Sequence, residues 1–213
     1  MKILSLNVGL PQEVESNGKI VRTSIFKKPV TARVGVTRLN LEGDEQSDLT
    51  VHGGLDKAVY AYPSEHYAFW RREFPGMDLP WGMFGENFTT EGLSEETVRI
   101  GDSFRIGSAE FMVTEPRMPC FKLGIRFGRA DIIKRFLKSR RTGFYFRVQH
   151  EGEVAAGDAI DKLGRDEYGV TVADVVEAYA DGETKSDLLR RLSELPALPE
   201  DWRGYFRQRL LNA

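Results

Sequence analysis

The chain contains a single cysteine, Cys120, within a segment (residues 115–129) that is rich in cationic side chains. Its nearest cations in the sequence are Arg117 and Lys122, and prolines at positions 116 and 119 predict a rigid bend there. A thiol among fixed positive charges is biased toward the thiolate, which attacks electrophiles or binds soft metals. The alternative is a cysteine that packs as a small buried hydrophobic residue. Residue type alone leaves both interpretations open.

Positive charge is concentrated around this cysteine. Between residues 117 and 147 there are ten Lys and Arg residues against one acid, Asp131. Such a density in a nearly neutral protein indicates an anionic ligand, most simply a phosphate. For residues 134–141 the alternative is the solvated face of a helix.

Two other segments carry residue types that suit ligand binding. His52 precedes a pair of glycines, which allow backbone N–H groups to approach a ligand closely. Glu86 and Asn87 place an acid and an amide at a predicted bend. Each segment, taken alone, is more typical of a turn than of a binding site. The three histidines do not have zinc-ligand spacing.

Composition describes an ordinary folded protein. The 213 residues are 41% hydrophobic and 29% charged, and the net charge of −2 gives no general attraction to nucleic acid or membrane. The first residues have neither a signal-peptide nor a transmembrane pattern. One cysteine cannot form an internal disulfide, so we expect a reducing, cytoplasmic location.

The patterning predicts a strand-rich body followed by helices. Strands are expected over residues 2–8, 19–28 and 34–41, and a helix begins after Ser64 with Tyr67, Trp70 and Phe74 on one face. Three short amphipathic helices follow residue 169. Many short strands in uneven hairpins favour a closed or half-closed barrel. We therefore predict a body over residues 1–165 and a helical extension over residues 166–213.

The order of the motifs resembles a known family. The motifs are GDEQSDLTVHGGLDKAVYAYPSEHY, GENFTTEGL, TVRIGDSFRIG, EPRMPCFKLGIRF, and GFYFRV with EVAAGD. Together they are similar to the MOSC domain, and most similar to the bacterial MOSC proteins with a C-terminal three-helix extension that detoxify 6-N-hydroxylaminopurine. The resemblance covers nearly the whole chain, including IFKKPV upstream.

The resemblance implies a mainly β fold, an irregular MOSC-type β-barrel with peripheral helices and a C-terminal three-helix appendage. It also implies a molybdenum cofactor, in which a pyranopterin holds the metal and carries a phosphate. Cys120 would be the catalytic residue and the protein ligand to molybdenum. The other residues expected to bind the cofactor are Lys27, His52, Gly53, Gly54, Asp56, Lys57, Glu86, Asn87, Phe88, Arg117 and Arg147. Of these, Lys27 and Arg117 are expected to face the phosphate or the metal oxo groups, and Arg147 is included on charge alone.

The implied reaction is reduction of an N-hydroxylated base to an amine with release of water. The sequence contains no cysteine set for an iron–sulfur cluster and no flavin fingerprint, so we expect electrons from a separate reductase. Two alternatives remain: a sulfur carrier with a persulfide on Cys120, and a non-enzymatic module that binds nucleic acid. The near-neutral charge argues against the second, and we expect neither nucleic acid nor membrane as a partner. The sequence leaves the oligomeric state open.

Overall fold

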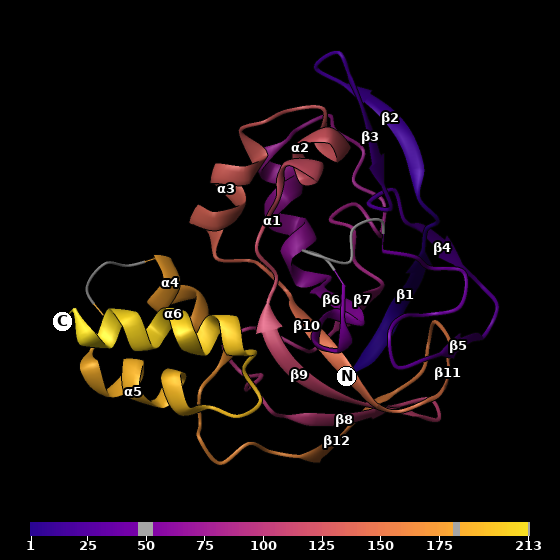
Figure 1. Ribbon diagram of the computed structural model, residues 1–213. Helices are drawn as coiled ribbons and strands as arrows, with labels where there is room; N and C mark the ends of the chain where they lie inside the picture. Colours follow the sequence, from indigo (N-terminus) through magenta and orange to yellow (C-terminus); the bar gives the residue numbers. More distant parts are fainter. Residues whose placement is uncertain (47–52, 181–183, 213) are drawn as a thin grey trace.

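An eight-stranded sheet forms the body of the protein in a computed structural model, which describes residues 1–46, 53–180 and 184–212 (Figure 1). All neighbouring strands are antiparallel except β6 and β7, which are parallel. In spatial order the strands are β12 (Ile160–Gly164), β8 (Ser103–Ile106), β9 (Ala109–Pro116), β10 (Phe144–His150), β6 (Val59–Pro63), β7 (Phe88–Glu91), β1 (Lys2–Val8) and β4 (Lys28–Val30).

Two small sheets complete the strand structure. One is a hairpin that extends away from the body (Figure 1), and its turn uses Asn17 and Gly18, both with positive φ. Such a turn matches the right-handed twist of a hairpin. The four strands of the small sheets are β2 (Gln12–Ser16) with β3 (Lys19–Thr23), and β5 (Val34–Val36) with β11 (Gly152–Val154).

The mainly β body with peripheral helices is confirmed, but the large sheet is not closed into the predicted barrel. Its edges are β4 and β12, which do not pair with each other. The chain near β12 does approach β1: Ile3 N donates to Asp158 O at 3.0 Å, and Ile160 N donates to Met1 O at 3.0 Å. Only one isolated bridge, between Lys2 and Ala159, forms there. The sheet therefore curves without a continuous ladder that would close it.

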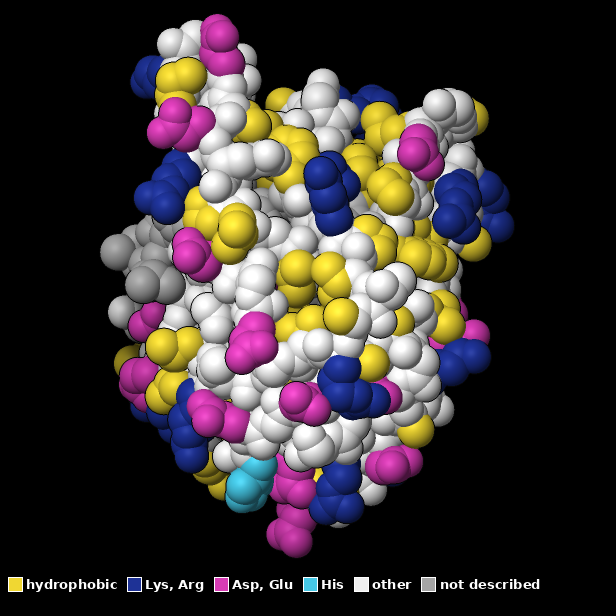
Figure 2. All heavy atoms as spheres, turned by 90° about the vertical axis from the view of Figure 1, so that its right-hand side faces the viewer, with side chains coloured by type: hydrophobic (Ala, Val, Ile, Leu, Met, Phe, Trp, Pro, Cys, Tyr) yellow, Lys and Arg dark blue, Asp and Glu magenta, His cyan; other side chains and the backbone are white. Residues whose placement is uncertain are grey.

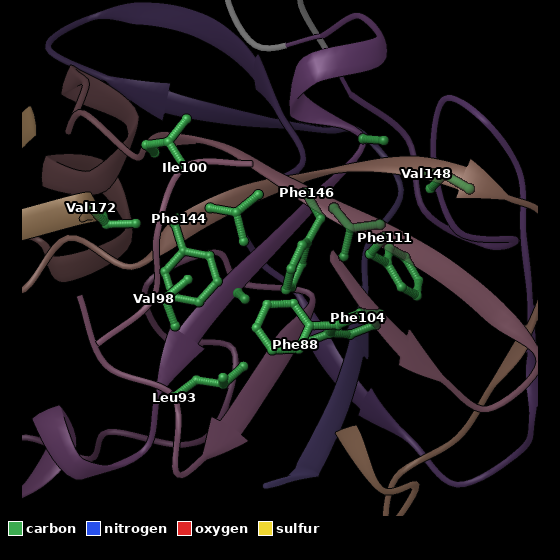
Figure 3. Close-up of a cluster of buried hydrophobic side chains, with 14 of the residues drawn as sticks. Phe88, Leu93, Val98, Ile100, Phe104, Phe111, Phe144, Phe146, Val148 and Val172 are labelled. Carbon is green, nitrogen blue, oxygen red and sulfur yellow. The ribbon is translucent and has the colours of Figure 1, made fainter. Parts of the chain in front are cut away.

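Buried aromatic rings fill the concave side of the sheet (Figure 3). Phe111 contacts Phe88 edge-on, with ring centroids 5.6 Å apart, and lies 5.5 Å from Phe146. A second hydrophobic cluster lies around Trp70 and Phe84, beside three helices. The helices and the short 3-10 turn of the body are η1 (Leu55–Lys57), α1 (Glu65–Glu73), α2 (Phe121–Phe127) and α3 (Ile132–Ser139).

The bend predicted around Cys120 leads directly into a helix that the sequence analysis did not predict. Helix α2 begins at the next residue and ends at Phe127, and it is followed by Gly128, whose φ of 64° suits a glycine. The helix buries Leu123 and Phe127 against the second cluster. A helix of seven residues is too short to be stable by itself, so its formation depends on this packing, which the sequence alone does not show.

Three C-terminal helices lie together beside one end of the sheet (Figure 1). Their buried side chains, including Val172, Leu192 and Phe206, belong to the same hydrophobic cluster as the sheet interior. None of the helices in the described part of the chain is both long and apolar enough to cross a membrane. The three helices are α4 (Val172–Ala180), α5 (Ser186–Glu194) and α6 (Glu200–Leu211).

The boundary predicted near residue 165 can be tested by limited proteolysis. Arg165 is exposed in the connection after β12, whereas the backbone of Asp166 is held by Arg99 and Asp102. We expect a protease of broad specificity to cut first between residues 164 and 169, where Arg165, Glu167 and Tyr168 are exposed. The two fragments are expected to remain associated because they share one hydrophobic cluster. Mass spectrometry of the early fragments gives the answer. A first cut within the strands of the body would contradict this boundary.

Candidate functional site

One cleft brings together segments that lie far apart in the sequence. It contains about 580 Å³ of space, including the part that is open to solvent. Its wall comes from the segment between β3 and β4, the loop before η1, η1 itself, β6, the turn before β7, the turn before α2, α2 and β10. The lining residues are Thr23, Ser24, Ile25, Lys27, Asp44, Glu45, Gln46, Lys57, Tyr60, Gly85, Asn87, Arg117, Cys120, Lys122 and Tyr145.

Five of the residues predicted to contact the cofactor line this cleft. They are Lys27, Lys57, Asn87, Arg117 and Cys120. They come from four separate segments, because Arg117 and Cys120 share the turn between β9 and α2. Loops that converge at one side of a sheet commonly form binding sites in this way. The thiol and four polar side chains predicted to act with it therefore share one concave surface.

Cys120 lies directly before α2, where its extended backbone (φ −121°, ψ 172°) leads into the first helical turn. The residue is half-buried and lines the cleft, so its thiol is neither enclosed in the core nor fully in solvent. The interpretation as a closed structural cysteine does not describe this environment. A thiol at a cleft wall can contact a ligand in the cleft.

Arg117 supplies a buried positive charge to the same wall. Its side chain is packed between two rings, with the guanidinium carbon 5.4 Å from the centroid of Tyr60 and 5.3 Å from that of Phe136. Burial acts to lower the pKa of Arg117, but the neighbouring Tyr60, Tyr145 and Cys120 groups raise it above its usual value. The guanidinium is therefore a permanent cation in the site.

Two buried polar atoms of the lining have no hydrogen-bond partner among the described residues. They are Nη1 of Arg117, a residue that is 6% exposed, and Oγ of Ser24, a residue that is 9% exposed. The described part of the chain also provides no carboxylate in ion-pair distance of Arg117. A buried donor without a partner costs free energy, on the order of 1–3 kcal/mol and more for a charged group. The pair is suited to the oxygen atoms of a bound anion.

Lys27 differs from Arg117 because its charge is already compensated. Its Nζ forms an ion pair with Oδ1 of Asp44, and both side chains are buried. Asp44 also accepts hydrogen bonds from Asn87 Nδ2 at 2.9 Å and from Gly9 N at 2.8 Å. Lys27 therefore helps to fix the cleft wall, and Asp44, which the sequence analysis missed, fixes both Lys27 and Asn87.

The segment after the predicted His-Gly-Gly turn is anchored mainly by groups outside the cleft. Asp56 pairs with Arg147, whose Nε lies 2.8 Å from Asp56 Oδ1, and Thr114 Oγ1 donates to Asp56 O at 2.6 Å. Neither Asp56 nor Arg147 lines the cleft. Their ion pair instead holds η1 against the sheet, which places Lys57 at the cleft wall.

The two glycines of that turn also lie outside the cleft lining. Gly53 is half-buried and Gly54 is exposed, with a φ of 97° that favours glycine. Gly54 O accepts a hydrogen bond from Lys57 N at 3.2 Å, so the turn starts η1. His52 lies outside the described residues.

Glu86 and Phe88 do not contact the cleft, contrary to the sequence-based prediction. Glu86 is completely buried and accepts hydrogen bonds from Tyr67 OH at 2.5 Å, Gly82 N at 2.9 Å and Phe84 N at 3.0 Å. Burial raises its pKa, which these hydrogen bonds oppose. The carboxyl group therefore shapes the turn that presents Asn87. Phe88 points to the opposite side of the strand, into the sheet interior (Figure 3).

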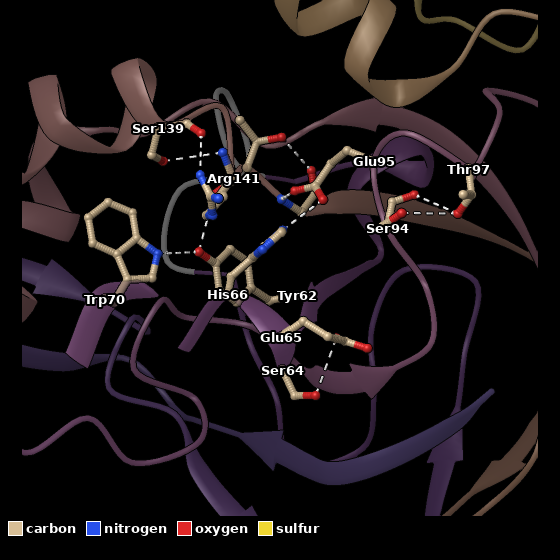
Figure 4. Close-up of polar contacts among 12 residues, drawn as sticks. Tyr62, Ser64, Glu65, His66, Trp70, Ser94, Glu95, Thr97, Ser139 and Arg141 are labelled. Atoms are coloured by element: carbon tan, nitrogen blue, oxygen red, sulfur yellow. Dashed lines mark hydrogen bonds and ion pairs between the residues drawn. The ribbon is translucent and has the colours of Figure 1, made fainter. Parts of the chain in front are cut away.

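Polar contacts of Glu95 (Figure 4) hold Gly143, the residue before β10. Glu95 accepts from Gly143 N at 2.7 Å and lies 2.7 Å from His66 Nε2. Gly143 O accepts from Arg117 N at 3.3 Å, and a Cβ at Gly143 would come within 2.3 Å of Ala61 O. Only glycine fits this position, where φ is 62°.

Tyr60 and Tyr145 are lining residues that the sequence analysis did not single out. Both lie in strands, and their rings are in contact at a centroid distance of 5.3 Å, tilted by 40° to each other. Burial raises the pKa of Tyr145 to about 12, although Arg117 opposes this shift, so its phenol stays neutral. The alternation of side chains along strands places both rings on one side of the sheet, but the sequence did not reveal which side carries the cleft.

At least half of the ten cations in the predicted patch are paired with an acid or buried. Asp131 pairs with Arg129 at 2.6 Å and with Arg135 at 2.8 Å. Arg135 also lies 2.9 Å from Glu73, and Lys122 is only 8% exposed. On the face drawn in Figure 2, Lys and Arg side chains are dispersed among acidic and hydrophobic ones. On that face the pattern of the described residues is typical of a solvated surface and shows no continuous basic patch.

Nearly the whole chain is similar to known proteins. Residues 48–161 match a model of the MOSC domain, and residues 170–213 match a model of the YiiM-like, 3-alpha helix domain. The chain is 46% identical to the uncharacterized protein YflK of Bacillus subtilis (strain 168), with 96% of this chain and 92% of YflK covered. It is 35% identical to protein YiiM of Escherichia coli (strain K12), with 89% and 85% covered.

A third relative is longer. The chain is 33% identical to a protein named "Reductase" from Gibberella moniliformis (strain M3125 / FGSC 7600), with 91% of this chain but only 35% of that protein covered. Among solved structures, YiiM from Geobacillus stearothermophilus is similar with a TM-score of 0.82, at 32% identity and with 98% of both chains covered. The similarity therefore extends through both the sheet and the C-terminal helices.

Proposed function

The chain belongs to the MOSC domain family, with a YiiM-like three-helix domain at its C-terminal end, and from this premise we propose that it is a reductase of N-hydroxylated bases that uses a molybdenum cofactor. The observation that carries the proposal is the cleft in which Cys120 lies beside the buried guanidinium of Arg117. The relative named "Reductase" supports an oxidoreductase. The substrate class and the need for molybdenum are our inference.

The chemistry of the lining residues fits such a cofactor. A thiolate is a soft ligand that suits molybdenum, and Cys120 is the only cysteine of the chain. The unpartnered donors of Arg117 and Ser24 suit the anionic oxygen atoms of the cofactor. Asn87 and Lys57 offer polar groups for the edge of a pterin. When bound, the cofactor would supply the two electrons of the reduction.

Side chains of the protein would supply protons and stabilise charge during the reduction. Reduction of the N–O bond needs two electrons and two protons, and it yields an amine and water. Lys57 Nζ is an acid in the lining that could protonate the leaving oxygen. Arg117 keeps the wall positive, which favours binding of a substrate oxygen that gains negative charge as the bond breaks. The electrons enter from a separate donor protein.

Metal analysis combined with an activity assay tests this proposal. Protein purified from a host that makes the cofactor is expected to contain close to stoichiometric molybdenum. With reduced methyl viologen as electron source, it is expected to convert 6-N-hydroxylaminopurine to adenine. Protein from a host that cannot make the cofactor is the control, and we expect it to be inactive.

Two results would contradict the proposal. One is equal activity with and without molybdenum. The other is a molybdenum-free protein that carries cyanide-releasable sulfur on Cys120, which would favour the persulfide carrier.

A further inference from the structure

One hydrogen bond connects the C-terminal helices to a residue that lies behind the wall of the cleft. Trp202, on α6, donates its indole N–H to Oε2 of Glu115 at 2.6 Å. Glu115 lies near the end of β9 and is 4% exposed. The two residues are 87 positions apart in the sequence, so this contact is formed only by the tertiary structure.

The same carboxyl group faces a residue of the cleft. Its other oxygen, Oε1, has no hydrogen-bond partner among the described residues and lies 3.8 Å from Lys57 Nζ, within ion-pair distance. Lys57 lines the cleft together with Cys120. Glu115 therefore has α6 on one side and a lysine of the candidate site on the other.

The indole is held firmly enough to orient the carboxyl group. Its ring contacts Tyr179 of α4 at a centroid distance of 5.4 Å and Phe206 of α6 at 5.8 Å. The Phe206 ring is nearly parallel to the indole, at 22°. Rings packed on two sides restrict the direction in which the N–H group can donate.

We propose that Trp202 is a positioning residue for the cleft: its indole N–H fixes the carboxyl group of Glu115, and that carboxyl group fixes Lys57 Nζ at the cleft wall. The three-helix extension would then complete the site rather than only cover the sheet. This role for the extension goes beyond the proposed function, on which it rests only where turnover is measured.

The environment of Glu115 makes the link sensitive to pH near neutrality. Burial raises the pKa of Glu115 to about 7, although Lys57 and Trp202 lower it. The nearby acids Asp56 and Asp201 act to raise it further, and Tyr145 also faces this group. Below this pKa, Glu115 gains a proton and no longer attracts Lys57 by charge. Above it, the ion pair is present and Lys57 is held.

A titration of the three indole N–H signals by NMR tests the link without requiring a bound cofactor. The Trp202 signal is expected to shift with an inflection near pH 7, because its acceptor changes charge there. The Trp70 signal is the internal control, since its indole donates to the neutral hydroxyl of Tyr62. Trp202→Phe identifies the signal by its loss.

Substitutions of Glu115 and Lys57 test whether the inflection of the Trp202 signal comes from Glu115. In Glu115→Gln the inflection of Trp202 is expected to disappear. In Lys57→Met it is expected to move to higher pH, because Lys57 lowers the pKa of Glu115. A Trp202 signal without an inflection, or one that persists in Glu115→Gln, would overturn the proposal. This holds whether or not the protein uses molybdenum.

Turnover gives a second readout. Trp202→Phe is expected to lower kcat/KM by about fivefold to tenfold at neutral pH, which is within the range of one ordinary lost hydrogen bond. The same substitution is expected to have little effect in a Glu115→Gln background. Tyr205→Phe, a change on the same helix, is the matched control. An equal loss in both backgrounds would show that Trp202 acts only through packing and would overturn the positioning role.

Discussion

Replacing Cys120 by serine is expected to abolish molybdenum-dependent reduction while leaving the fold intact. The residue is half-buried at a cleft wall, so a serine of nearly the same size costs little packing. A hydroxyl group is a much poorer ligand for a soft metal than a thiolate. Loss of a direct ligand is expected to reduce activity by more than about 100-fold, since even outer-shell changes cost 10–100-fold. Activity, metal content and thermal unfolding of the same preparation measure the effect.

Met118→Leu is the matched control for this variant. It removes the sulfur of another half-buried residue of the same turn, one that does not line the cleft. We expect the control to retain both metal and activity. A Cys120→Ser protein that unfolds at much lower temperature, with no separate loss of activity per folded molecule, would restore the interpretation of a structural cysteine.

Replacing Arg117 by methionine is expected to weaken retention of the cofactor without destabilising the fold. The guanidinium is buried between aromatic rings, with Nη1 unpartnered, and none of the described carboxylates pairs with it. Removing a buried, unpaired charge relieves its desolvation cost, while methionine still fills the space between the rings. The lost contact to an anion is expected to lower cofactor affinity about 10- to 100-fold.

The matched control is Arg126→Met. Arg126 also stacks on an aromatic ring, with its guanidinium carbon 5.0 Å from the centroid of Phe26, but it does not line the cleft. Retention is measured as pterin and molybdenum per folded protein after dialysis. Equal losses in both variants, or a fall in melting temperature for Arg117→Met alone, would contradict an anion-binding role for Arg117.

The sequence identified residues that share the cleft better than it predicted their contacts. Cys120 and Arg117 could be selected because a lone thiol among cations is visible as a local pattern. The partner of Lys27 was not visible, because Asp44 comes from a different loop and meets it only in the folded chain. The position of Glu86 was not predicted for a similar reason. An acid at a predicted bend is compatible with ligand binding, and the sequence does not show that Tyr67 and Gly82 donate hydrogen bonds to this carboxylate.

For the fold, too, local elements were predictable from the sequence and long-range arrangements were not. The helix with Tyr67, Trp70 and Phe74 on one face was predictable from spacing, and all three side chains are buried. The open sheet was not, because strand patterns do not determine whether the two edges of a sheet pair. The link from Trp202 to Glu115 was also beyond sequence reasoning, since an amphipathic helix shows which side is buried but not which group that side meets.

X-ray absorption at the molybdenum edge tests the central claim most directly, because it identifies the atoms bound to the metal. In the wild-type protein we expect a protein sulfur in addition to the dithiolene sulfurs of the cofactor, and in Cys120→Ser we expect that additional sulfur to be absent. An unchanged sulfur coordination in the variant would contradict the role of Cys120 as ligand. A wild-type protein that contains no molybdenum, when purified from a host that makes the cofactor, would contradict the account of the cleft.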